Sequence, residues 1–478
     1  MRAQRGTGMR RIKGFILGGL ALALSIAPAH AAQGLDGAAM SLVWALPFAG
    51  ILLSIALGPL LFHQWWHPHY GKAAAFWAAL VIGAMGWSAE PDATAQALFH
   101  TLALEYAPFI LMLFALYTTA GGLVLRGNLH GTPMVNTAIL AGGSLLASII
   151  GTTGAAMLLI RPLLRANDDR RHNAHVFVFF IFLVANIGGS LTPLGDPPLF
   201  LGFLRGVEFF WTMRNLMQET AFALGVLLVL FFLIDLYVYR REGIVRPDST
   251  PDDPLRVIGL VNIPLLAIAI GAIVLSGVWK PGVSVTILGT QLELQNLVRE
   301  ATMVIVGLVS LALSDKAARR ENGFDWEPIR EVAKLFAAIF VCIIPVMAML
   351  QAGDNGVFAP LLALVAKPDG SPDNVAYFWL TGILSSLLDN APTYLVFFQL
   401  AGGDPVRLMG PLAGTLAALS LGAVFMGAMT YIGNAPNFMV YAIARDSGVK
   451  MPGFFGFMLW SGAILVPLFL AVTWLFVR

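Results

Sequence analysis

Long apolar runs separated by short polar loops occupy almost the whole chain. A helix needs ~20 residues to cross a hydrocarbon core of ~30 Å, and ten runs meet or approach this length. They lie at residues 42–62, 73–88, 101–123, 175–204, 215–238, 257–279, 299–314, 331–353, 411–441 and 454–477. The pattern predicts an all-α polytopic membrane protein with about 10–11 transmembrane helices.

Two further apolar segments are interrupted near their middle by polar residues. Segment 134–163 is interrupted at 151–153, and segment 376–401 is interrupted at 389–393. Broken backbone at membrane depth is tolerated only where it is buried in protein or lines a cavity. We therefore expect each segment to be a re-entrant helical hairpin, which enters and leaves on one membrane face.

The two halves of the chain repeat each other at one offset. Ser148-Ile-Ile-Gly-Thr-Thr resembles Ser386-Leu-Leu-Asp-Asn-Ala, and the twelve residues from Gly189 resemble the twelve from Gly427, with five identities. Both offsets are 238 residues (386 − 148 and 427 − 189). Equivalent spans are separated by five crossings, an odd number, so the copies are predicted to have inverted topology. We expect repeat 1 over residues 40–240 with hairpin 134–163, and repeat 2 over residues 257–478 with hairpin 376–401. The polar, Pro-rich segment 239–256 is expected to link them.

Loop charges predict the orientation. The loops at 164–174, 239–256 and 315–330 are rich in Lys and Arg, whereas those at 89–100 and 354–375 hold one basic residue. Because basic loops favour the cytoplasmic side, the first three loops and the short loop 63–72 are expected to lie inside. Hairpin 134–163 then opens from the cytoplasm and hairpin 376–401 from outside. The expected location is the bacterial inner (plasma) membrane.

The first 31 residues resemble a targeting segment. A basic start is followed by a short apolar run and by Ala29-His30-Ala31, which matches an A-x-A cleavage site. The segment 1–31 is expected to be a signal peptide, or alternatively a retained first helix.

Composition agrees with a lipid environment. Apolar residues make up 58% of the chain and charged residues 12%, and the mean hydropathy is +0.78. This charge content is too small for a soluble surface, so the lipid bilayer is the expected partner. The formal charge of +2 does not indicate nucleic-acid binding, and the single cysteine, Cys342, excludes a disulfide framework.

Asp196 is the strongest candidate for chemistry. An ionised carboxylate inside a membrane costs ~2.5–3.5 kcal/mol on insertion scales, so it is normally functional or paired. Asp196 precedes Pro197-Pro198, which lack N–H donors, so the helix must open here. The freed carbonyl oxygens suit a hard cation such as Na⁺. We predict that Asp196 binds Na⁺ or H⁺; the alternative is that it only caps the following half-helix.

The second hairpin carries a second acid. Asp389 is predicted to be a further ion ligand, with Asn390 and Thr393 as oxygen donors, or alternatively a helix cap. The same place in the first hairpin has hydroxyls but no acid, at Thr152 and Thr153. Polar residues at the same depth complete the predicted site: Asn186, Ser190, Thr192, Thr430, Asn434 and Asn437.

These motifs resemble the ion-transporter superfamily. Asn186-Ile-Gly-Gly189 followed by Pro193-Leu-Gly-Asp196 is similar to a stretch of citrate-transporter-like proteins and of NhaD-type sodium/proton antiporters. Ser385-Ser-Leu-Leu-Asp-Asn-Ala-Pro392 resembles their second hairpin. The resemblance implies two inverted repeats whose hairpin-bearing part moves past a scaffold, often within a homodimer.

We therefore expect a secondary transporter and not an enzyme, with no cofactor apart from the transported Na⁺ and H⁺. The first hypothesis is a sodium/proton antiporter that binds the two ions alternately at Asp196 and Asp389. The alternative is a citrate or dicarboxylate symporter coupled to Na⁺ or H⁺. The carboxylate symporters of the superfamily carry Ser-Asn-Thr at both hairpin tips, and this chain does not.

A remote alternative is an intramembrane enzyme or a scaffold. Gly195-Asp196 matches part of the Gly-x-Gly-Asp motif of intramembrane aspartyl proteases, but Pro193 replaces its first glycine.

Overall fold

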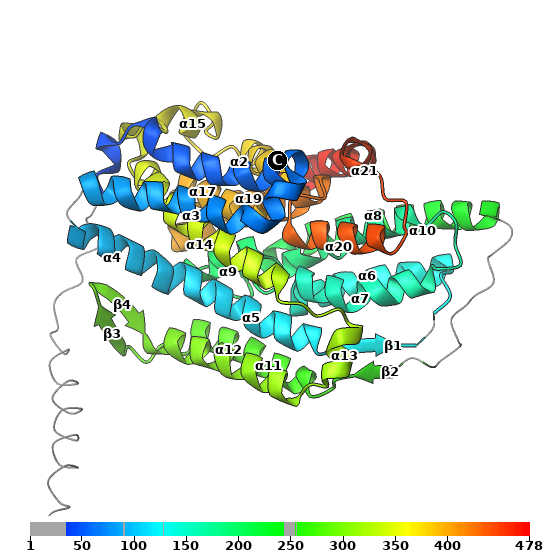
Figure 1. Cartoon of the computed structure of the whole chain (residues 1–478). Helices are drawn as coiled ribbons and strands as arrows, with labels where there is room; N and C mark the ends of the chain where they lie inside the picture. The colour runs from blue at the N-terminus through cyan, green and yellow to red at the C-terminus, as the bar shows by residue number, and fades with distance from the viewer. Residues whose placement is uncertain (1–34, 89–90, 128, 243–253, 255) are drawn as a thin grey trace, which may run out of the picture.

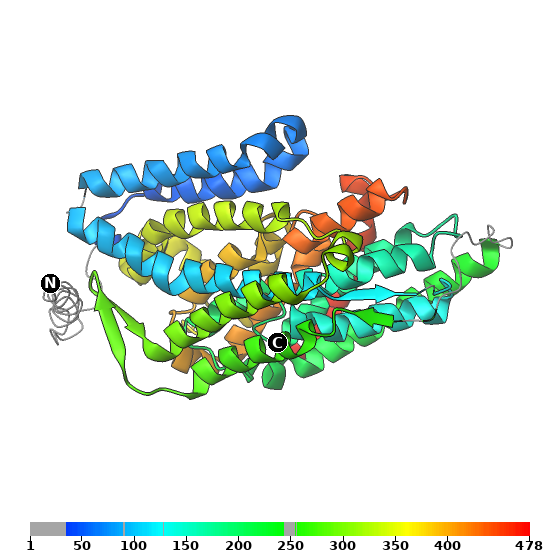
Figure 2. The ribbon, with the colours of Figure 1, turned by 60° about the horizontal axis from the view of Figure 1, so that its bottom comes forward.

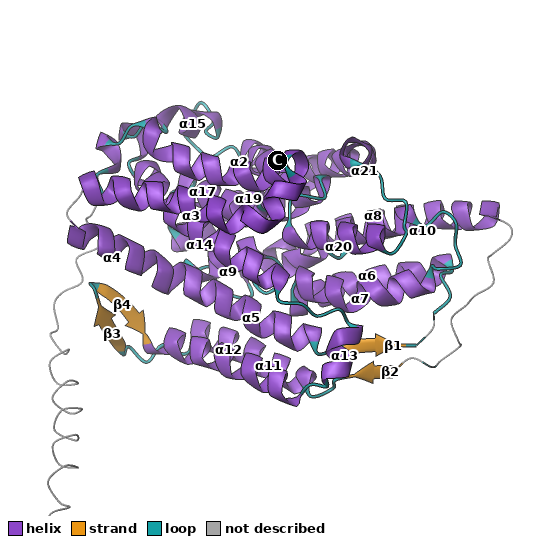
Figure 3. Cartoon of the chain, viewed as in Figure 1, coloured by secondary structure: helices purple, strands orange, loops and turns teal. Residues whose placement is uncertain are grey.

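The computed structural model describes residues 35–88, 91–127, 129–242, 254 and 256–478. The predicted signal-like segment 1–31 and most of the predicted linker 239–256 lie outside these residues. The described chain is helical apart from two short antiparallel strand pairs, which lie at opposite ends of the molecule (Figure 3). The pairs are β1 (Val124–Arg126) with β2 (Arg256–Ile258), and β3 (Ser284–Ile287) with β4 (Thr290–Glu293).

Eight described helical segments are long and apolar enough to cross a membrane. They are Leu42–Leu61, Pro91–Gly121, Pro133–Ile150, Ala174–Leu191, Trp211–Glu242, Leu294–Leu313, Glu327–Gln351 and Phe454–Val477. Two shorter apolar helices, Asn262–Val278 and Ala413–Met429, add to them. The prediction of an all-α polytopic membrane protein is confirmed.

The helices lie roughly parallel to one another in a flattened bundle (Figure 1). The pair α2 (Leu46–Leu61) and α3 (His63–Ser88) forms one edge, and the pair α11 (Asn262–Val278) and α12 (Leu294–Leu313) lies toward the opposite edge (Figure 2). Helix α14 (Glu327–Gln351) packs against the first pair.

Helix α5 packs against α11 and α12. It continues α4 through one turn of π-helix; their bounds are α4 (Pro91–Thr101), the π-helical turn (Leu102–Tyr106) and α5 (Ala107–Gly121).

The expected loop 63–72 is helical, which corrects the sequence-based prediction. Phe62 alone separates α2 from α3, and its carbonyl accepts hydrogen bonds from the N–H groups of Trp65 and Trp66 at 2.9 and 2.8 Å. These bonds start the new helix directly after the old one, so no loop is needed.

Two helix pairs are each joined by a very short connection, as expected for the two interrupted segments. In the first pair, α6 (Pro133–Ile150) and α7 (Thr152–Ala166) are separated by Gly151 alone, and the two helices pack side by side. Gly151 has φ +83°, a conformation that favours glycine.

In the second pair, α16 (Asn374–Leu387) and α17 (Asn390–Leu400) are separated by Leu388 and Asp389. The helix thus resumes at Asn390, earlier than the expected interruption at 389–393. Pro392 falls in the first turn of α17, where its missing N–H removes no intrahelical bond.

Two further helices are broken in the middle. Helix α8 (Ala174–Leu183) leads through the 3₁₀ turn Ile187–Leu191 to the short α9 (Pro197–Leu204). In the second half, α19 (Ala413–Met426) leads through the 3₁₀ turn Gly427–Met429 to α20 (Ala435–Asp446). The remaining helices are α10 (Trp211–Glu242), α13 (Lys316–Glu321), α15 (Ala359–Leu364), α18 (Pro405–Met409) and α21 (Phe454–Val472).

The broken helix of the first half lies in the centre of the protein. In the segment Ala174–Leu191, 94% of the apolar window is buried inside the protein, against 22% for α10. Non-helical backbone in a membrane requires such burial, because lipid cannot hydrogen-bond the freed N–H and C=O groups. The core therefore encloses the break that carries Asp196.

Candidate ion-binding site

The two broken helices have the same backbone conformation at equivalent positions. Thr192 and Thr430 are both extended, with φ −139° and −132°, and Asp196 and Asn434 are both extended, with φ −138° and −150°. Each of the last two residues stands directly before a half-helix, α9 or α20. The sequence repeat is therefore also a repeat of local structure.

One hydrogen bond recurs in both halves at the offset of 238. The hydroxyl of Thr192 donates to the carbonyl oxygen of Ser148, and the hydroxyl of Thr430 donates to that of Ser386 at 2.6 Å. Each bond fastens a broken helix to the last turn of the neighbouring α6 or α16. The threonines at both breaks thus hold backbone together.

The repeated glycines allow the chain to pass close to itself. A Cβ atom at Gly195 would lie 2.0 Å from the carbonyl oxygen of Gly189, and one at Gly433 would lie 2.7 Å from that of Gly427. Real Cβ atoms essentially never come so near. The close approach requires glycine at both breaks.

Asp196 lies at the meeting point of both halves. Its Oδ2 accepts a hydrogen bond from Nδ2 of Asn390 at 2.7 Å, and its Oδ1 accepts from Nδ2 of Asn434 at 3.0 Å. The hydroxyl of Thr152, in the first turn of α7, lies 3.3 Å from Oδ1. The carboxylate therefore connects α7 and α9 of the first half with α17 and α20 of the second.

These four residues form two repeat-equivalent pairs. Asp196 and Asn434 differ by 238 positions, and so do Thr152 and Asn390 (390 − 152). Asp196 contacts its own equivalent, Asn434, directly. Because Asp196 belongs to the first half of the chain and Asn434 to the second, the cluster joins the two halves.

The side chain of Asp196 does not cap α9, although the residue occupies the N-cap position. The first two residues of the helix, Pro197 and Pro198, have no N–H to offer. The carboxylate turns to neutral amides and a hydroxyl of other elements instead. The Asp196 side chain therefore makes no cap hydrogen bond in this structure, and ion binding by this residue stays a prediction.

No described Arg, Lys or His side chain forms an ion pair with this carboxylate. Among the described residues, no Arg, Lys or His nitrogen lies within 4.0 Å of the Asp196 oxygens, and the side chain is buried, with 1% exposure. Nor do the described residues contain a group of three His, Cys, Asp or Glu placed to hold a metal ion. A cation bound here would meet one carboxylate and neutral oxygens.

A second set of amides extends the cluster. Nδ2 of Asn186 donates to Oδ1 of Asn437 at 2.6 Å, and Nδ2 of Asn437 donates to the carbonyls of Gly427 at 2.9 Å and Thr430 at 3.0 Å. Nδ2 of Asn434 lies 3.5 Å from Oδ1 of Asn186. Asn437 thus satisfies two of the carbonyl oxygens at the second break.

Asp389 has a different role from Asp196 in this structure. Its Oδ1 accepts a hydrogen bond from the N–H of Ala391 at 3.0 Å, so it caps α17, and its side chain is half-buried. The hydroxyl of Thr393 donates to the carbonyl oxygen of Asp389 at 3.0 Å. The cap is the contact that the structure records for this carboxylate.

Two other predicted residues have no recorded contact with Asp196. Ser190 bonds Thr220 of α10 at 2.7 Å and the carbonyl of Ile187 at 2.8 Å, and so faces α10. Thr153 is half-buried in the first turn of α7. Of the predicted residues, the structure brings Thr152, Asn390 and Asn434 directly onto Asp196, with Asn186 next to them.

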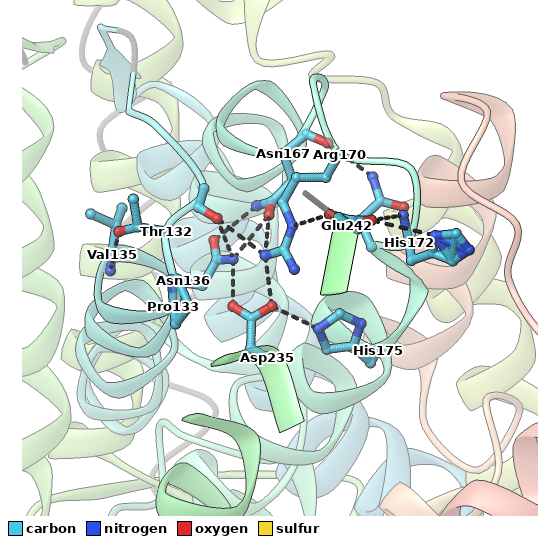
Figure 4. A network of polar contacts seen from close by, with 12 residues as sticks. Thr132, Pro133, Val135, Asn136, Asn167, Arg170, His172, His175, Asp235 and Glu242 are labelled. Atoms are coloured by element: carbon cyan, nitrogen blue, oxygen red, sulfur yellow. Dashed lines mark hydrogen bonds and ion pairs between the residues drawn. The ribbon is translucent and has the colours of Figure 1, made fainter. Parts of the chain in front are cut away.

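A second buried carboxylate, Asp235 on α10, did not enter the prediction. It is fully buried and lies 2.6 Å from Nη1 of Arg170, 2.8 Å from Nε2 of His175 and 3.0 Å from Nδ2 of Asn136 (Figure 4). Asn136 also bonds Asn167, which ends α7, at 2.8 and 2.9 Å. The network ties the open end of the first hairpin to α8 and α10.

A sequence signal for this network was present. An aspartate near the end of an apolar span, with an arginine in a nearby loop, indicates an ion pair. The sequence alone does not identify Arg170 as the partner of Asp235, because 65 positions (235 − 170) separate the two charges.

The comparison with known families agrees with this architecture. Residues 37–477 match the family described as "Putative citrate transport". The chain belongs to this family, and it is a transporter-type multi-pass membrane protein.

Two similar proteins are known in mycobacteria. An uncharacterized transporter of Mycobacterium bovis and one of Mycobacterium tuberculosis are each 26% identical over 363 residues, which cover 73% of this chain and 78% of theirs. Their names support transport and specify no substrate.

Proposed function

We propose that this protein is a sodium/proton antiporter of the bacterial inner membrane, with Asp196 as the residue that binds the two ions alternately. The observation that carries this proposal is a fully buried carboxylate surrounded by neutral donors and by no described basic side chain. Such a carboxylate needs a positive partner, because an isolated buried charge is costly. A proton or a sodium ion supplies it.

Exchange follows from competition for one carboxylate. When Na⁺ enters, Asp196 releases its proton, and Oδ1 and Oδ2 become ligands together with the hydroxyl of Thr152. The amide oxygens of Asn390 and Asn434 are close enough to join once their side chains turn. When Na⁺ leaves, a proton returns to the carboxylate. One carboxylate thus excludes simultaneous binding of both ions, which couples their movements.

The arrangement of the repeats supports alternating access. Inverted repeats place a site at the membrane midplane, where discontinuous helices present their ends to the ion. The contact between Asp196 and its equivalent Asn434 is consistent with such a midplane site. We infer that hairpins α6–α7 and α16–α17 are re-entrant from opposite faces, and that they move with the site against the remaining helices. A homodimer would provide the fixed frame.

The family match favours a second candidate, which is a citrate or dicarboxylate symporter coupled to Na⁺ or H⁺. In that case Asp196 would hold the coupling ion, and the half-helices α9 and α20 would direct their positive amino ends toward the substrate carboxylates. We propose the antiporter first because no described basic residue at Asp196 offers a partner for a substrate carboxylate.

A vesicle experiment separates the two candidates. Purified protein is reconstituted into liposomes with a pH-sensitive dye inside, and a Na⁺ gradient is applied without any organic anion. We expect Na⁺-driven proton movement that Asp196→Asn abolishes. Glu219→Gln is the matched control, because it neutralises a half-buried acid of α10 outside the cluster. If proton movement is absent but labelled citrate accumulates with a Na⁺ or H⁺ gradient, the symporter is correct.

A rescue variant sharpens the experiment. Adding Asn434→Asp to Asp196→Asn moves the carboxylate to the repeat-equivalent position, where it again faces residue 196. Partial recovery of exchange would assign the function to the charge at the junction of the two halves.

A further inference from the structure

A cavity of about 960 Å³ lies at the opposite end of α7 from Asp196. Its walls come from the end of α7, the loop that follows and the start of α8, from α10, and from α21 with the turn before it. The lining includes several basic side chains and one tryptophan: Arg165, Arg170, Arg171, His172, Lys450 and Trp460. Loop charges predict that this end faces the cytoplasm.

Arg170 is the most buried of these cations, and only part of its guanidinium group is bonded within the protein. The side chain of Arg170 is 1% exposed, with Nη1 2.6 Å from Asp235 and Nε 3.5 Å from Glu242 (Figure 4). Its Nη2 has no hydrogen-bond partner among the described residues. A buried guanidinium N–H without a partner costs free energy, so an acceptor in the cavity would stabilise the site.

The remaining charges on the wall favour an anion. Arg165, Arg171 and Lys450 line the cavity around Arg170, and Asp168 is the one carboxylate among the lining residues. Asp235 and Glu242, which neutralise Arg170, do not line it. A ligand in the cavity therefore meets an excess of positive charge.

One side of the cavity is apolar and borders the lipid-facing surface. Ile234 and Val238 of α10 and Trp460 of α21 line it. The neighbouring Tyr237 and Leu459 are 63% and 76% exposed, which in a membrane helix means contact with lipid. The cavity thus combines a cationic wall with an apolar wall beside the bilayer, which suits a molecule with an anionic head and an apolar tail.

We propose that this cavity binds the phosphate headgroup of an anionic phospholipid. Phosphate oxygens accept charge-assisted hydrogen bonds from guanidinium groups, and basic pockets between transmembrane helices on the cytoplasmic side bind anionic headgroups. The phosphate lies against Arg171 and Lys450, and one of its oxygens accepts a hydrogen bond from Nη2 of Arg170 once the guanidinium turns toward the cavity. The acyl chains lie along α10 and Trp460. The lipid then joins the base of the first hairpin to α10 and to the turn after α20.

The test compares lipid binding by the full chain and by two charge-matched variants. Arg171→Gln/Lys450→Gln removes two exposed cations of the cavity, whereas Arg240→Gln/Arg241→Gln removes two exposed cations of α10 that do not line it. Native mass spectrometry measures retention of phosphatidylglycerol and phosphatidylcholine by the detergent-purified protein. We expect phosphatidylglycerol affinity to fall at least about tenfold in the cavity variant and less than about twofold in the control.

Three outcomes would overturn the proposal. Equal retention of both lipids by the unaltered protein would show that the headgroup charge is not recognised. Equal losses in both variants would show a general surface-charge effect. Displacement of phosphatidylglycerol by millimolar inorganic phosphate would identify a site for free anions instead of lipid. Thermal unfolding of both variants checks that they remain folded.

Discussion

Asp196 and Asp235 are two fully buried carboxylates that lie near opposite ends of helix α7. They differ in the charge of the side chains around them. Thr152, at the start of α7, contacts Asp196, whereas Asn167, directly after α7, belongs to the network of Asp235. Helix α7 has 15 residues and so spans about 22 Å. Asp235 has an arginine and a histidine beside it, and Asp196 has amides and a hydroxyl.

The difference indicates that Asp235 has a structural role, whereas Asp196 can still bind a cation. A carboxylate paired with a buried arginine is already neutralised, and breaking the pair leaves an uncompensated charge. A carboxylate held only by neutral donors keeps its charge available for a mobile cation. The first hairpin is thus anchored at its open end by Asp235 and reaches the proposed ion site with its tip.

The largest expected effect is on stability, from removal of the paired charge. Asp235→Asn should lower the free energy of unfolding by about 3–5 kcal/mol, because the buried Arg170 loses its nearer counter-ion and keeps only the longer contact to Glu242 at 3.5 Å. Thermal unfolding in detergent measures the loss. The double variant Arg170→Gln/Asp235→Asn should recover part of it, and a double variant as unstable as the single one would contradict the pairing argument.

The unpaired carboxylate should behave in the opposite way. Asp196→Asn should leave the free energy of unfolding in Na⁺-free buffer within about 1 kcal/mol of the unaltered protein, since no counter-charge is orphaned. Saturating Na⁺ should stabilise the unaltered protein by about 2.7 kcal/mol at 100 times its Kd and should not stabilise the variant. A Na⁺ effect of equal size in both proteins would remove Asp196 from the site.

A smaller effect is expected from the hydroxyl at the hairpin tip. Thr152→Val keeps the shape of the side chain but removes the hydroxyl that lies 3.3 Å from Asp196. Na⁺ affinity should fall by about tenfold, because the variant loses a hydroxyl that both touches the Asp196 carboxylate and serves as a proposed ligand of the ion. Ion-dependent thermal shifts measure the affinity. Thr137→Val is the control, because that hydroxyl bonds only the carbonyl of Pro133 within α6.

The smallest effect is expected at the third acid, Asp389. Asparagine caps helices as well as aspartate does, so Asp389→Asn should change stability by less than about 0.5 kcal/mol and exchange by less than about twofold. Reconstituted exchange measures this directly. A loss as large as that of Asp196→Asn would show that Asp389 is a second ion ligand and that charge is needed on both sides of the site.

The sequence alone predicted the membrane fold and both kinds of helix break. The lengths of the apolar runs, the composition of the loops and the repeat offset of 238 are local or periodic features of the sequence. Secondary structure depends directly on such features. The glycines and prolines at 195, 197 and 433 explain why each helix opens, since these residues act through their own backbone. The prediction of a loop at 63–72 was wrong because a single residue, Phe62, suffices to restart the helix.

Only the tertiary structure decided which polar residues act together. Asp196 and Asp389 looked alike in the sequence, as carboxylates at breaks in apolar segments. In the folded chain one lies where the two halves meet, among Thr152, Asn390 and Asn434, and the other caps α17. The ion pair between Asp235 and Arg170 is likewise formed only by the packing of the folded chain. Composition and periodicity set the elements, but the charge state that a buried carboxylate can adopt depends on side chains brought from distant positions by packing.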